Sequence, residues 1–357
     1  MVYLILVINP GSTSTKVAIF NNNKLIQEQT LKHEIEDLKR FPTIIDQLSF
    51  RKQVILDFLT EHRYIPANID VFVGRGGLLK PLRQSGTYLI TDNMIEDLKN
   101  CKYGSHASNL GALLANELAR PLNRPAYIVN PVSIDEIEDI ARVSGFKGIE
   151  RISMFHVLNQ KAIARKHAKS IGKKYEELTL IVAHLGSGFT VGLHHKGRVI
   201  DVNNGMGGDG PFSPERTGQL PTYPLIELCF SGKYTEEQVK KMLAGHGGLV
   251  SYLGTASGIE IENRIKEGDK EAEFYLKAMA YNVVKEIGSL YFAAKGLIDG
   301  VIVTGGFARN QRFIDYIKDY LALIIPIVVY PGEDEMRALA EGALNVLTKK
   351  EKIIANE

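Results

Sequence analysis

Leu4-Ile5-Leu6-Val7-Ile8-Asn9-Pro10-Gly11-Ser12-Thr13-Ser14-Thr15-Lys16-Val17-Ala18-Ile19-Phe20 is the stretch that decides the expected fold. Its five leading apolar residues, rich in branched side chains, predict a strand buried on both faces, and residues 17–20 predict a second strand. Gly11, in the turn between them, can adopt a positive φ and let the backbone approach a ligand. With its hydroxyls and the ammonium of Lys16, this corner is typical of a phosphate cradle, although an ordinary hairpin with a polar tip would look the same.

The motif occurs a second time, at Leu180-Ile181-Val182-Ala183-His184-Leu185-Gly186-Ser187-Gly188-Phe189-Thr190-Val191-Gly192-Leu193. Gly11 aligns with Gly186, an offset of 175 residues. In that alignment His184 stands against Asn9. Self-similarity at such a long offset indicates duplicated domains, and two facing turns would clamp one nucleotide between them.

Composition narrows the function classes. A chain of 357 residues suits two domains, and 45% hydrophobic with 24% charged residues is typical of a soluble globular protein. A net charge of +2 gives no electrostatic case for nucleic acid or an anionic membrane as partner. Cys101 and Cys229 are expected to be buried free thiols in a reducing compartment. Without a signal peptide or an apolar run long enough to span a bilayer, the chain is expected to be cytoplasmic.

Strands and helices are expected to alternate, which predicts an α/β fold with mixed sheets. Beyond the two hairpins, strands are expected at residues 70–73, 126–129, 300–304 and 327–330. Helices are expected at residues 52–61, 93–101, 106–119, 135–142, 155–171, 271–295, 310–323 and 334–349, with Ser105 as an N-cap and a long loop over 203–222. The expected domains are residues 1–131 with the C-terminal helix 336–357, and residues 132–335.

Four expected strands end in polar or glycine-rich loops, where α/β sheets bind ligands. The loop Thr304-Gly305-Gly306-Phe307 precedes a helix and suits a phosphate or an adenosine ribose, although a plain tight turn is the alternative.

Arg75 ends an apolar strand before two glycines, and its partly buried charge must be paired. Either an internal carboxylate or an anionic substrate pairs it, since a guanidinium matches carboxylate and phosphate bidentately.

Several common sites are excluded. The chain has no P-loop motif and no zinc-ligand spacing. Residues 205–210 spell Gly-x-Gly-x-x-Gly, but Pro211 follows and no helix opens there, so they are not a dinucleotide fingerprint. Of three candidate histidines, His184 is the strongest because it aligns with Asn9, His156 is next, and His106 is the weakest.

In this order the motifs resemble those of the acetate and butyrate kinases, over essentially the whole chain. Residues 8–16 are similar to the family's opening signature, Arg75-Gly76-Gly77 to its substrate arginine, and residues 184–188 and 304–306 to its phosphate and adenosine loops. Phe212-Ser213-Pro214-Glu215-Arg216-Thr217-Gly218-Gln219-Leu220-Pro221 resembles a butyrate-kinase segment. The acetate-kinase motif Gly-Thr-Arg-Ser-Gly reads Gly254-Thr255-Ala256-Ser257-Gly258 here, which argues against acetate and leaves one family cation unassigned.

The resemblance implies two duplicated actin-like, ribonuclease H-like domains around an interdomain cleft, the first on the carboxylate and phosphate side and the second on the nucleotide side. It implies reversible transfer of the ATP γ-phosphoryl group to butyrate, with Mg²⁺, in a homo-oligomer. The implied catalytic residues are Arg75, His156 and His184. The other implied contacts are Asn9, Ser12, Ser14, Lys16, Gly186 and Gly188 to phosphate, Gly305, Gly306 and Phe307 to the nucleotide, and Glu335 to Mg²⁺ through water.

Two alternatives stay open. Within the family, the acceptor could be isobutyrate, propionate or acetate. Outside this activity, the same fold would suit a non-metabolic actin-like ATPase. A carboxylic acid has a pKa of about 4 to 5 and is already ionised at neutral pH, so a carboxylate kinase needs no general base.

Overall fold

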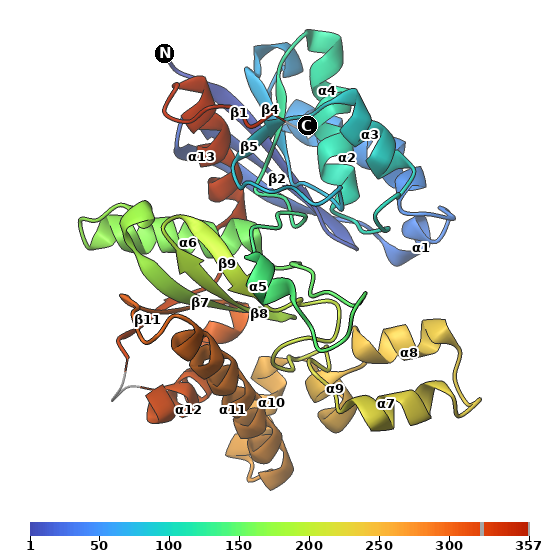
Figure 1. Cartoon of the computed structure of the whole chain (residues 1–357). Helices are drawn as coiled ribbons and strands as arrows, with labels where there is room; N and C mark the ends of the chain where they lie inside the picture. The colour runs from blue at the N-terminus through green and yellow to red at the C-terminus, as the bar shows by residue number, and fades with distance from the viewer. Residues whose placement is uncertain (322–324, 356–357) are drawn as a thin grey trace. The chain divides into compact units, whose positions relative to one another are not determined.

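A computed structural model describes residues 1–321 and 325–355 of the chain (Figure 1). The chain divides into two compact units. Unit 1 consists of Met1–Asp135 and Asp334–Glu357, and unit 2 consists of Glu136–Glu333. Unit 1 is therefore discontinuous in sequence, because the last helix of the chain packs on the first strands.

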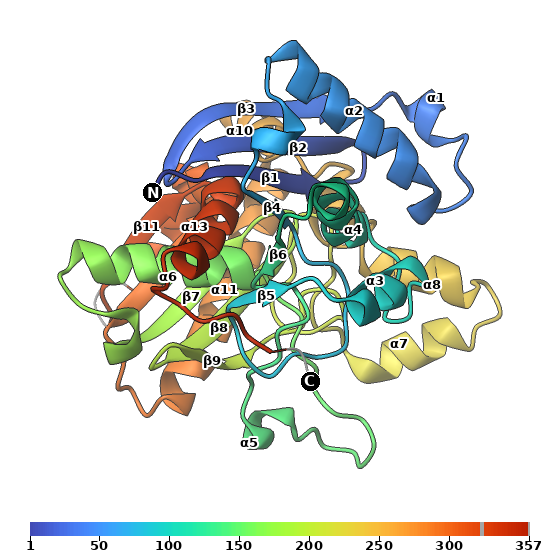
Figure 2. The ribbon, with the colours of Figure 1, turned by 90° about the horizontal axis from the view of Figure 1, so that it is seen from above.

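Unit 1 is built on a six-stranded sheet in the order β3-β2-β1-β4-β6-β5. Its strands are β1 (Leu4–Pro10), β2 (Ser14–Asn21), β3 (Lys24–Lys32), β4 (Val71–Gly74), β5 (Thr87–Leu89) and β6 (Ala126–Val129). Its helices are α1 (Ile35–Leu38), α2 (Leu48–Glu61), α3 (Asp92–Lys99), α4 (Asn109–Ala119) and α13 (Glu335–Leu347). Figure 2 shows α4 and α13 on opposite faces of the sheet, which explains why β1, β4 and β6 are apolar on both faces.

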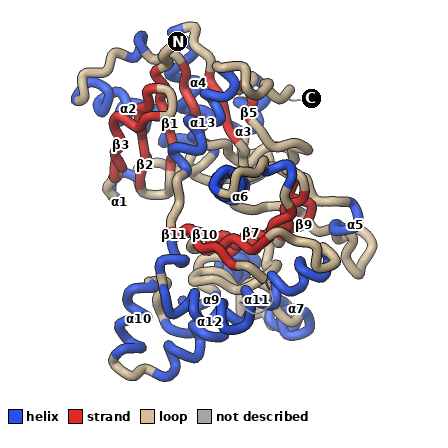
Figure 3. The backbone as a smooth tube through the Cα atoms, turned by 90° about the vertical axis from the view of Figure 1, so that its left-hand side faces the viewer, coloured by secondary structure: helices blue, strands red, loops and turns tan. Residues whose placement is uncertain are grey.

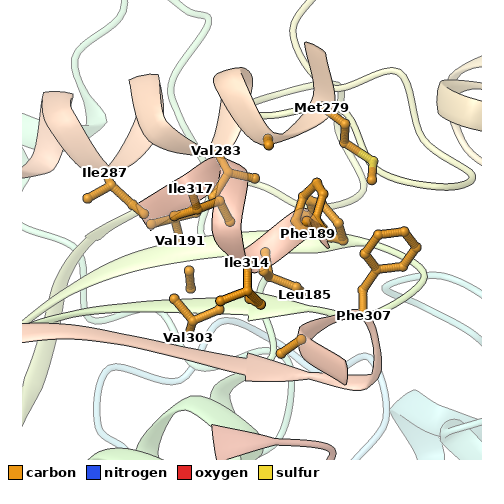
Figure 4. Close-up of a cluster of buried hydrophobic side chains, with 14 of the residues drawn as sticks. Leu185, Phe189, Val191, Met279, Val283, Ile287, Val303, Phe307, Ile314 and Ile317 are labelled. Carbon is orange, nitrogen blue, oxygen red and sulfur yellow. The ribbon is translucent and has the colours of Figure 1, made fainter. Parts of the chain in front are cut away.

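Unit 2 is built on a five-stranded sheet in the order β11-β10-β7-β8-β9. Its strands are β7 (Thr179–Leu185), β8 (Phe189–His195), β9 (Arg198–Val202), β10 (Gly300–Gly305) and β11 (Ile327–Pro331). Its helices are α5 (Asp139–Arg142), α6 (Val157–Ser170), α7 (Thr222–Cys229), α8 (Glu236–Leu243), α9 (Gly248–Leu253), α10 (Gly258–Lys266), α11 (Lys270–Ala293) and α12 (Gln311–Leu321). Helix α6 covers one face of the sheet and α11 and α12 cover the other, where they enclose the main apolar core (Figures 3 and 4).

The two sheets repeat one topology. In each, the third, second and first strands are antiparallel neighbours. The next two strands of the sheet, β4 and β6 in unit 1 and β10 and β11 in unit 2, lie parallel to the first, and unit 1 adds β5 as an antiparallel edge strand. Both second strands also shift register at the same point, between Ile19 and Phe20 in β2 and between Leu193 and His194 in β8. The strand order and the shared bulge support the duplication read from the sequence.

Some sequence expectations are wrong. Helix α4 begins at Asn109 and not at residue 106, so Ser105 is not its cap; the His106 carbonyl instead accepts the Asn109 N–H in a turn. The helix expected at 135–142 is reduced to α5, because residue 134 bridges Leu82 and residue 135 bonds the Leu82 carbonyl.

Helices α8 to α10 were not anticipated, and the end of the helix expected at 310–323 lies outside the described residues. Cys229 is exposed, contrary to expectation, because α7 buries none of its residues. Cys101 is half-buried and not buried as expected. No helix in residues 1–321 and 325–355 is long and apolar enough to cross a membrane.

Two glycines let α4 approach β4 closely. A Cβ on Gly111 would lie 2.3 Å from the Arg75 carbonyl oxygen, and one on Gly74 would lie 2.1 Å from the Gly111 oxygen. We expect Gly111→Ala to lower the free energy of unfolding by about 1–3 kcal/mol through overpacking, measured by urea denaturation. Gly288→Ala is the matched control, since that glycine in α11 has open space around its Cβ position. It should raise stability by about 0.5–1 kcal/mol, and equal effects of the two changes would contradict the packing argument.

Candidate functional site

A buried arginine holds the first glycine turn. Arg51 of α2 is fully buried, and its Nη1 donates to the carbonyl oxygens of Gly11 (2.7 Å) and Ser14 (2.9 Å). Its Nη2 donates to the Ser12 carbonyl oxygen (2.9 Å), while Nε donates to Gln47 Oε1 (3.0 Å). Burial lowers the pKa of Arg51 to about 10, so the guanidinium stays charged at neutral pH. The turn's carbonyl groups therefore bond into the protein, which leaves its hydroxyl side as the outer surface.

Arg51 was not among the predicted site residues, although its place in the sequence indicates a buried, paired charge. Arg51 lies four residues before Ile55, on the same apolar stripe of α2, and a charged residue on such a stripe needs a specific partner.

Near Arg51, His33 Nε2 lies 2.9 Å from Thr15 Oγ1. Burial, together with the charge of Arg51, lowers the pKa of His33 to about 4, so this imidazole is neutral at physiological pH.

Three predicted residues meet in unit 1. Arg75, at the end of β4, donates through Nη1 to Glu335 Oε2 (2.8 Å) and, at 3.4 Å, to Asn9 Oδ1. Asn9 Nδ2 donates to the same Glu335 oxygen (2.6 Å). Glu335 opens α13, where a carboxylate is favoured by the helix dipole. In the described part of the chain, Nε and Nη2 of Arg75 have no protein partner.

The other predicted phosphate contacts of unit 1 are more dispersed. Ser12 is exposed and Ser14 is half-buried on the turn that Arg51 holds. Lys16 is the cross-strand partner of Asn9, but its ammonium forms an ion pair with Glu28 of β3 at 2.8 Å. The structure therefore does not bring Lys16 into the Arg75–Glu335 cluster.

Two predicted histidines meet in unit 2. The rings of His156, just before α6, and His184, at the end of β7, stack with centroids 4.0 Å apart and an interplanar angle of 22°. His184 Nε2 lies 3.2 Å from Glu333 Oε1, and its buried Nδ1 has no partner among residues 1–321 and 325–355. His156 Nδ1 lies 2.8 Å from the hydroxyl of Thr190.

The second glycine turn also carries an arginine. A Cβ on Gly188 would lie 2.1 Å from Arg216 Nη1, so the guanidinium rests directly on that glycine. Arg216 Nη1 donates to the Gly205 carbonyl oxygen (2.6 Å), its single hydrogen-bond acceptor among the described residues. Burial lowers the pKa of Arg216, and Glu215 opposes that shift. The sequence placed Arg216 in a family segment but gave it no role.

The predicted nucleotide loop lies beside the same turn. Gly305 has a φ of 97°, and a Cβ there would lie 2.4 Å from the Leu185 carbonyl oxygen. Gly306 faces open space, whereas the Phe307 ring is buried against Phe189 and Phe313 (Figure 4). Phe307 can therefore offer a ligand its backbone but not its ring. A hollow of about 350 Å³ beside this loop is lined by Ala308, Arg309, Gln311, Ile314, Lys318, Val329 and Pro331.

The described residues do not form a protein cage for a metal ion. No group of three or more His, Cys, Asp or Glu side chains suited to a metal occurs among them. The Glu335 carboxylate is already bound by Arg75 and Asn9. This donor set fits Mg²⁺ only as an ion that keeps its waters and meets Glu335 through one of them.

The turn at residues 11–14 should depend on Arg51. Arg51→Met removes the guanidinium's hydrogen bonds to three carbonyl groups, so we expect a loss of about 3 kcal/mol in the free energy of unfolding and faster amide hydrogen exchange in that turn. Urea denaturation and exchange mass spectrometry measure the two effects. Arg120→Met, at an arginine whose side chain is 71% exposed, is the control and should change stability by less than about 0.5 kcal/mol. Unchanged exchange at residues 11–14 would contradict the role given to Arg51.

Comparisons with known proteins agree with this architecture. Residues 141–323, just over half of the chain, match the Acetokinase family. Among solved structures, acetate kinase from Porphyromonas gingivalis superposes with a TM-score of 0.80 at 18% identity, covering 97% of this chain and 100% of that one. A propionate kinase from Francisella tularensis gives 0.76 at 18% identity, covering 95% and 98%. A ROK family protein from Streptococcus pneumoniae gives 0.51 at 14% identity, covering 98% and 100%. At these identities the structures show the fold alone, and the predicted duplicated actin-like α/β architecture is confirmed.

Proposed function

The chain belongs to the acetokinase family, whose members are phosphotransferases with a carboxyl group as acceptor, and on that premise we propose that it is a butyrate kinase. The proposed reaction is reversible transfer of the ATP γ-phosphoryl group to butyrate, giving butyryl phosphate and ADP. Butyrate, in place of acetate, is supported by the resemblance of residues 212–221 to a butyrate-kinase segment and by Ala256 at the position of the acetate-kinase arginine.

The free edge of Arg75 carries the proposal. Glu335 and Asn9 fix this guanidinium through Nη1 alone. Nε and Nη2, without protein partners in the described residues, form the edge that binds a carboxylate or a phosphoryl group bidentately. The internal pairing thus orients Arg75 without using up its binding capacity. An acceptor carboxylate held there is already ionised, so the site needs donors and positive charge and no general base.

His156 and His184 would donate hydrogen bonds to the oxygens of the transferring phosphoryl group, where such donors have their largest effect on rate. We assign the family cation that is absent at Ala256 to Arg216, since its guanidinium lies on Gly188 in the predicted phosphate turn.

The remaining contacts are assigned to ATP. Asn9, Ser12, Ser14 and Lys16 of unit 1 and the turn 186–188 of unit 2 would face its phosphates. Gly305 and Gly306 would face its ribose, next to a hollow with apolar walls and two cations, Arg309 and Lys318. Mg²⁺, when bound, neutralises charge on the phosphate oxygens. In this assignment unit 1 holds the carboxylate and unit 2 holds the nucleotide. We further expect a homo-oligomer, acting in the cytoplasm.

Trapping the acyl phosphate with hydroxylamine tests the activity directly. Carboxylate-dependent hydroxamate and ADP formation supports the proposal, whereas ADP release that does not depend on a carboxylate would indicate a non-metabolic ATPase. Comparing kcat/KM for acetate, propionate, butyrate and isobutyrate decides the acceptor. A preference for another acid would overturn butyrate and leave carboxylate phosphorylation standing.

Arg75→Ala should lower kcat with butyrate by about 100-fold or more, because it removes the proposed carboxylate and phosphoryl ligand. The hydroxamate assay measures the loss, and circular dichroism checks that the fold is retained. The matched control is Arg83→Ala, an exposed arginine of the same unit, which should keep its activity. Near-normal turnover of butyrate by the Arg75 variant would refute the assignment.

Arg216→Gln should lower kcat by about 100-fold with little change in melting temperature, since the lost group is a cation and Gln can still donate to the Gly205 carbonyl. Adding Ala256→Arg to that variant should not restore the rate, since the proposed position of the cation is the one on Gly188 that Arg216 occupies. Rescue by the arginine at 256 would show that the cation was assigned to the wrong segment.

A further inference from the structure

A chain of buried hydrogen bonds runs behind His156 in unit 2. The Tyr175 hydroxyl lies 2.7 Å from His194 Nδ1, and His194 Nε2 lies 2.9 Å from Gln160 Oε1. Gln160 Nε2 lies 3.0 Å from the Thr190 carbonyl oxygen and 2.9 Å from the Thr190 hydroxyl, which reaches His156 Nδ1 at 2.8 Å. Gln160, Thr190 and His194 are each fully buried, so water cannot take the place of these partners.

One backbone carbonyl fixes the direction of the chain. The Thr190 carbonyl oxygen only accepts, so the Gln160 atom beside it is the NH₂ group and Oε1 faces His194. His194 must therefore carry its proton on Nε2 and accept from the Tyr175 hydroxyl at Nδ1. Burial, reinforced by the charge of Lys161, lowers the pKa of His194 well below its usual range, and burial raises the pKa of Tyr175. Both groups are therefore neutral, as this direction requires.

The other end of the chain reaches the candidate site. One N–H of the Gln160 amide occupies a lone pair of the Thr190 hydroxyl oxygen. Among the described residues the buried hydroxyl proton has no acceptor other than His156 Nδ1, so the hydroxyl donates to that nitrogen. A neutral imidazole that accepts at Nδ1 carries its proton on Nε2.

We propose that Gln160 and Thr190 are positioning residues that hold His156 as the neutral tautomer protonated on Nε2. In this form the ring carries an N–H at Nε2, on the side away from Thr190. The tautomer follows from the hydrogen bonds alone; only the identity of the acceptor, a phosphoryl oxygen, rests on the proposed function.

Long-range ¹H–¹⁵N correlation spectra of histidine-labelled protein test the tautomer, with His156→Gln used for assignment. The expected result at neutral pH is a pyrrole-type Nε2 and a pyridine-type Nδ1 for both His156 and His194. Thr190→Val keeps the side-chain shape and removes the hydroxyl, so the His156 signals should move toward a tautomer mixture. Thr190→Ser should restore them. A proton on Nδ1 in the wild type, or unchanged His156 signals in Thr190→Val, would overturn the proposal.

The chain offers a matched control. Thr179, on the neighbouring strand β7, places its hydroxyl 2.9 Å from His195 Nδ1, the same pairing away from His156. Thr179→Val should change the His195 signals and leave His156 and the rate unchanged.

In the hydroxamate assay, Thr190→Val should lower kcat by about tenfold with KM for the carboxylate unchanged, and Thr190→Ser should recover most of the rate. A shifted tautomer with an unchanged kcat would support the positioning role of Gln160 and Thr190 and remove His156 from the proposed reaction. Failure of the positioning proposal and failure of the proposed function are therefore separate results.

Discussion

The buried contact between the Arg51 guanidinium and the carbonyl groups of residues 11–14 is the constraint on which unit 1 depends. Burying a charge is unfavourable unless hydrogen bonds replace its water, and here backbone oxygens and Gln47 do so. Those same bonds fix which side of the turn faces outward. The first strand can therefore end in a rigid polar corner, and Asn9 at that end meets Arg75 and Glu335 in a defined geometry.

The duplicated halves stabilise equivalent corners in different ways. In unit 1 a guanidinium lies behind the glycine turn and binds its carbonyl groups. In unit 2 a guanidinium from the loop at residue 216 lies on Gly188, where any side chain would displace it. The strand order and bulge are shared, but the second turn is one residue shorter, pairing His184 with Thr190 where Asn9 pairs with Lys16. One ancestral scaffold thus carries an amide at one strand end and an imidazole at the other.

Local patterns predicted the sheets well, because apolar strands that end in glycine turns leave a clear signal in one sequence. They predicted less where contacts between residues far apart in the sequence decide the role of a side chain. Arg51 is recognisable only by its place on an apolar stripe, and Thr190 and Gln160 look like ordinary strand and helix residues until His156 and His194 are beside them. The apolar sequence of helix α7 suggests a buried helix, but in the structure none of its residues is buried. Lys16 fits a phosphate motif by position, yet its ammonium forms an ion pair with Glu28 on the next strand.

The discontinuity of unit 1 has a consequence for biosynthesis. Asn9 and Arg75 precede unit 2 in the chain, but Glu335, the carboxylate that orients Arg75, belongs to α13 and follows the whole of unit 2. A nascent chain can complete unit 2 from contiguous residues, since domains fold as units during translation. Unit 1 must wait with one face of its sheet uncovered until α13 is made. Translation order thus keeps the arginine unoriented until unit 2 and α13 have both been synthesised.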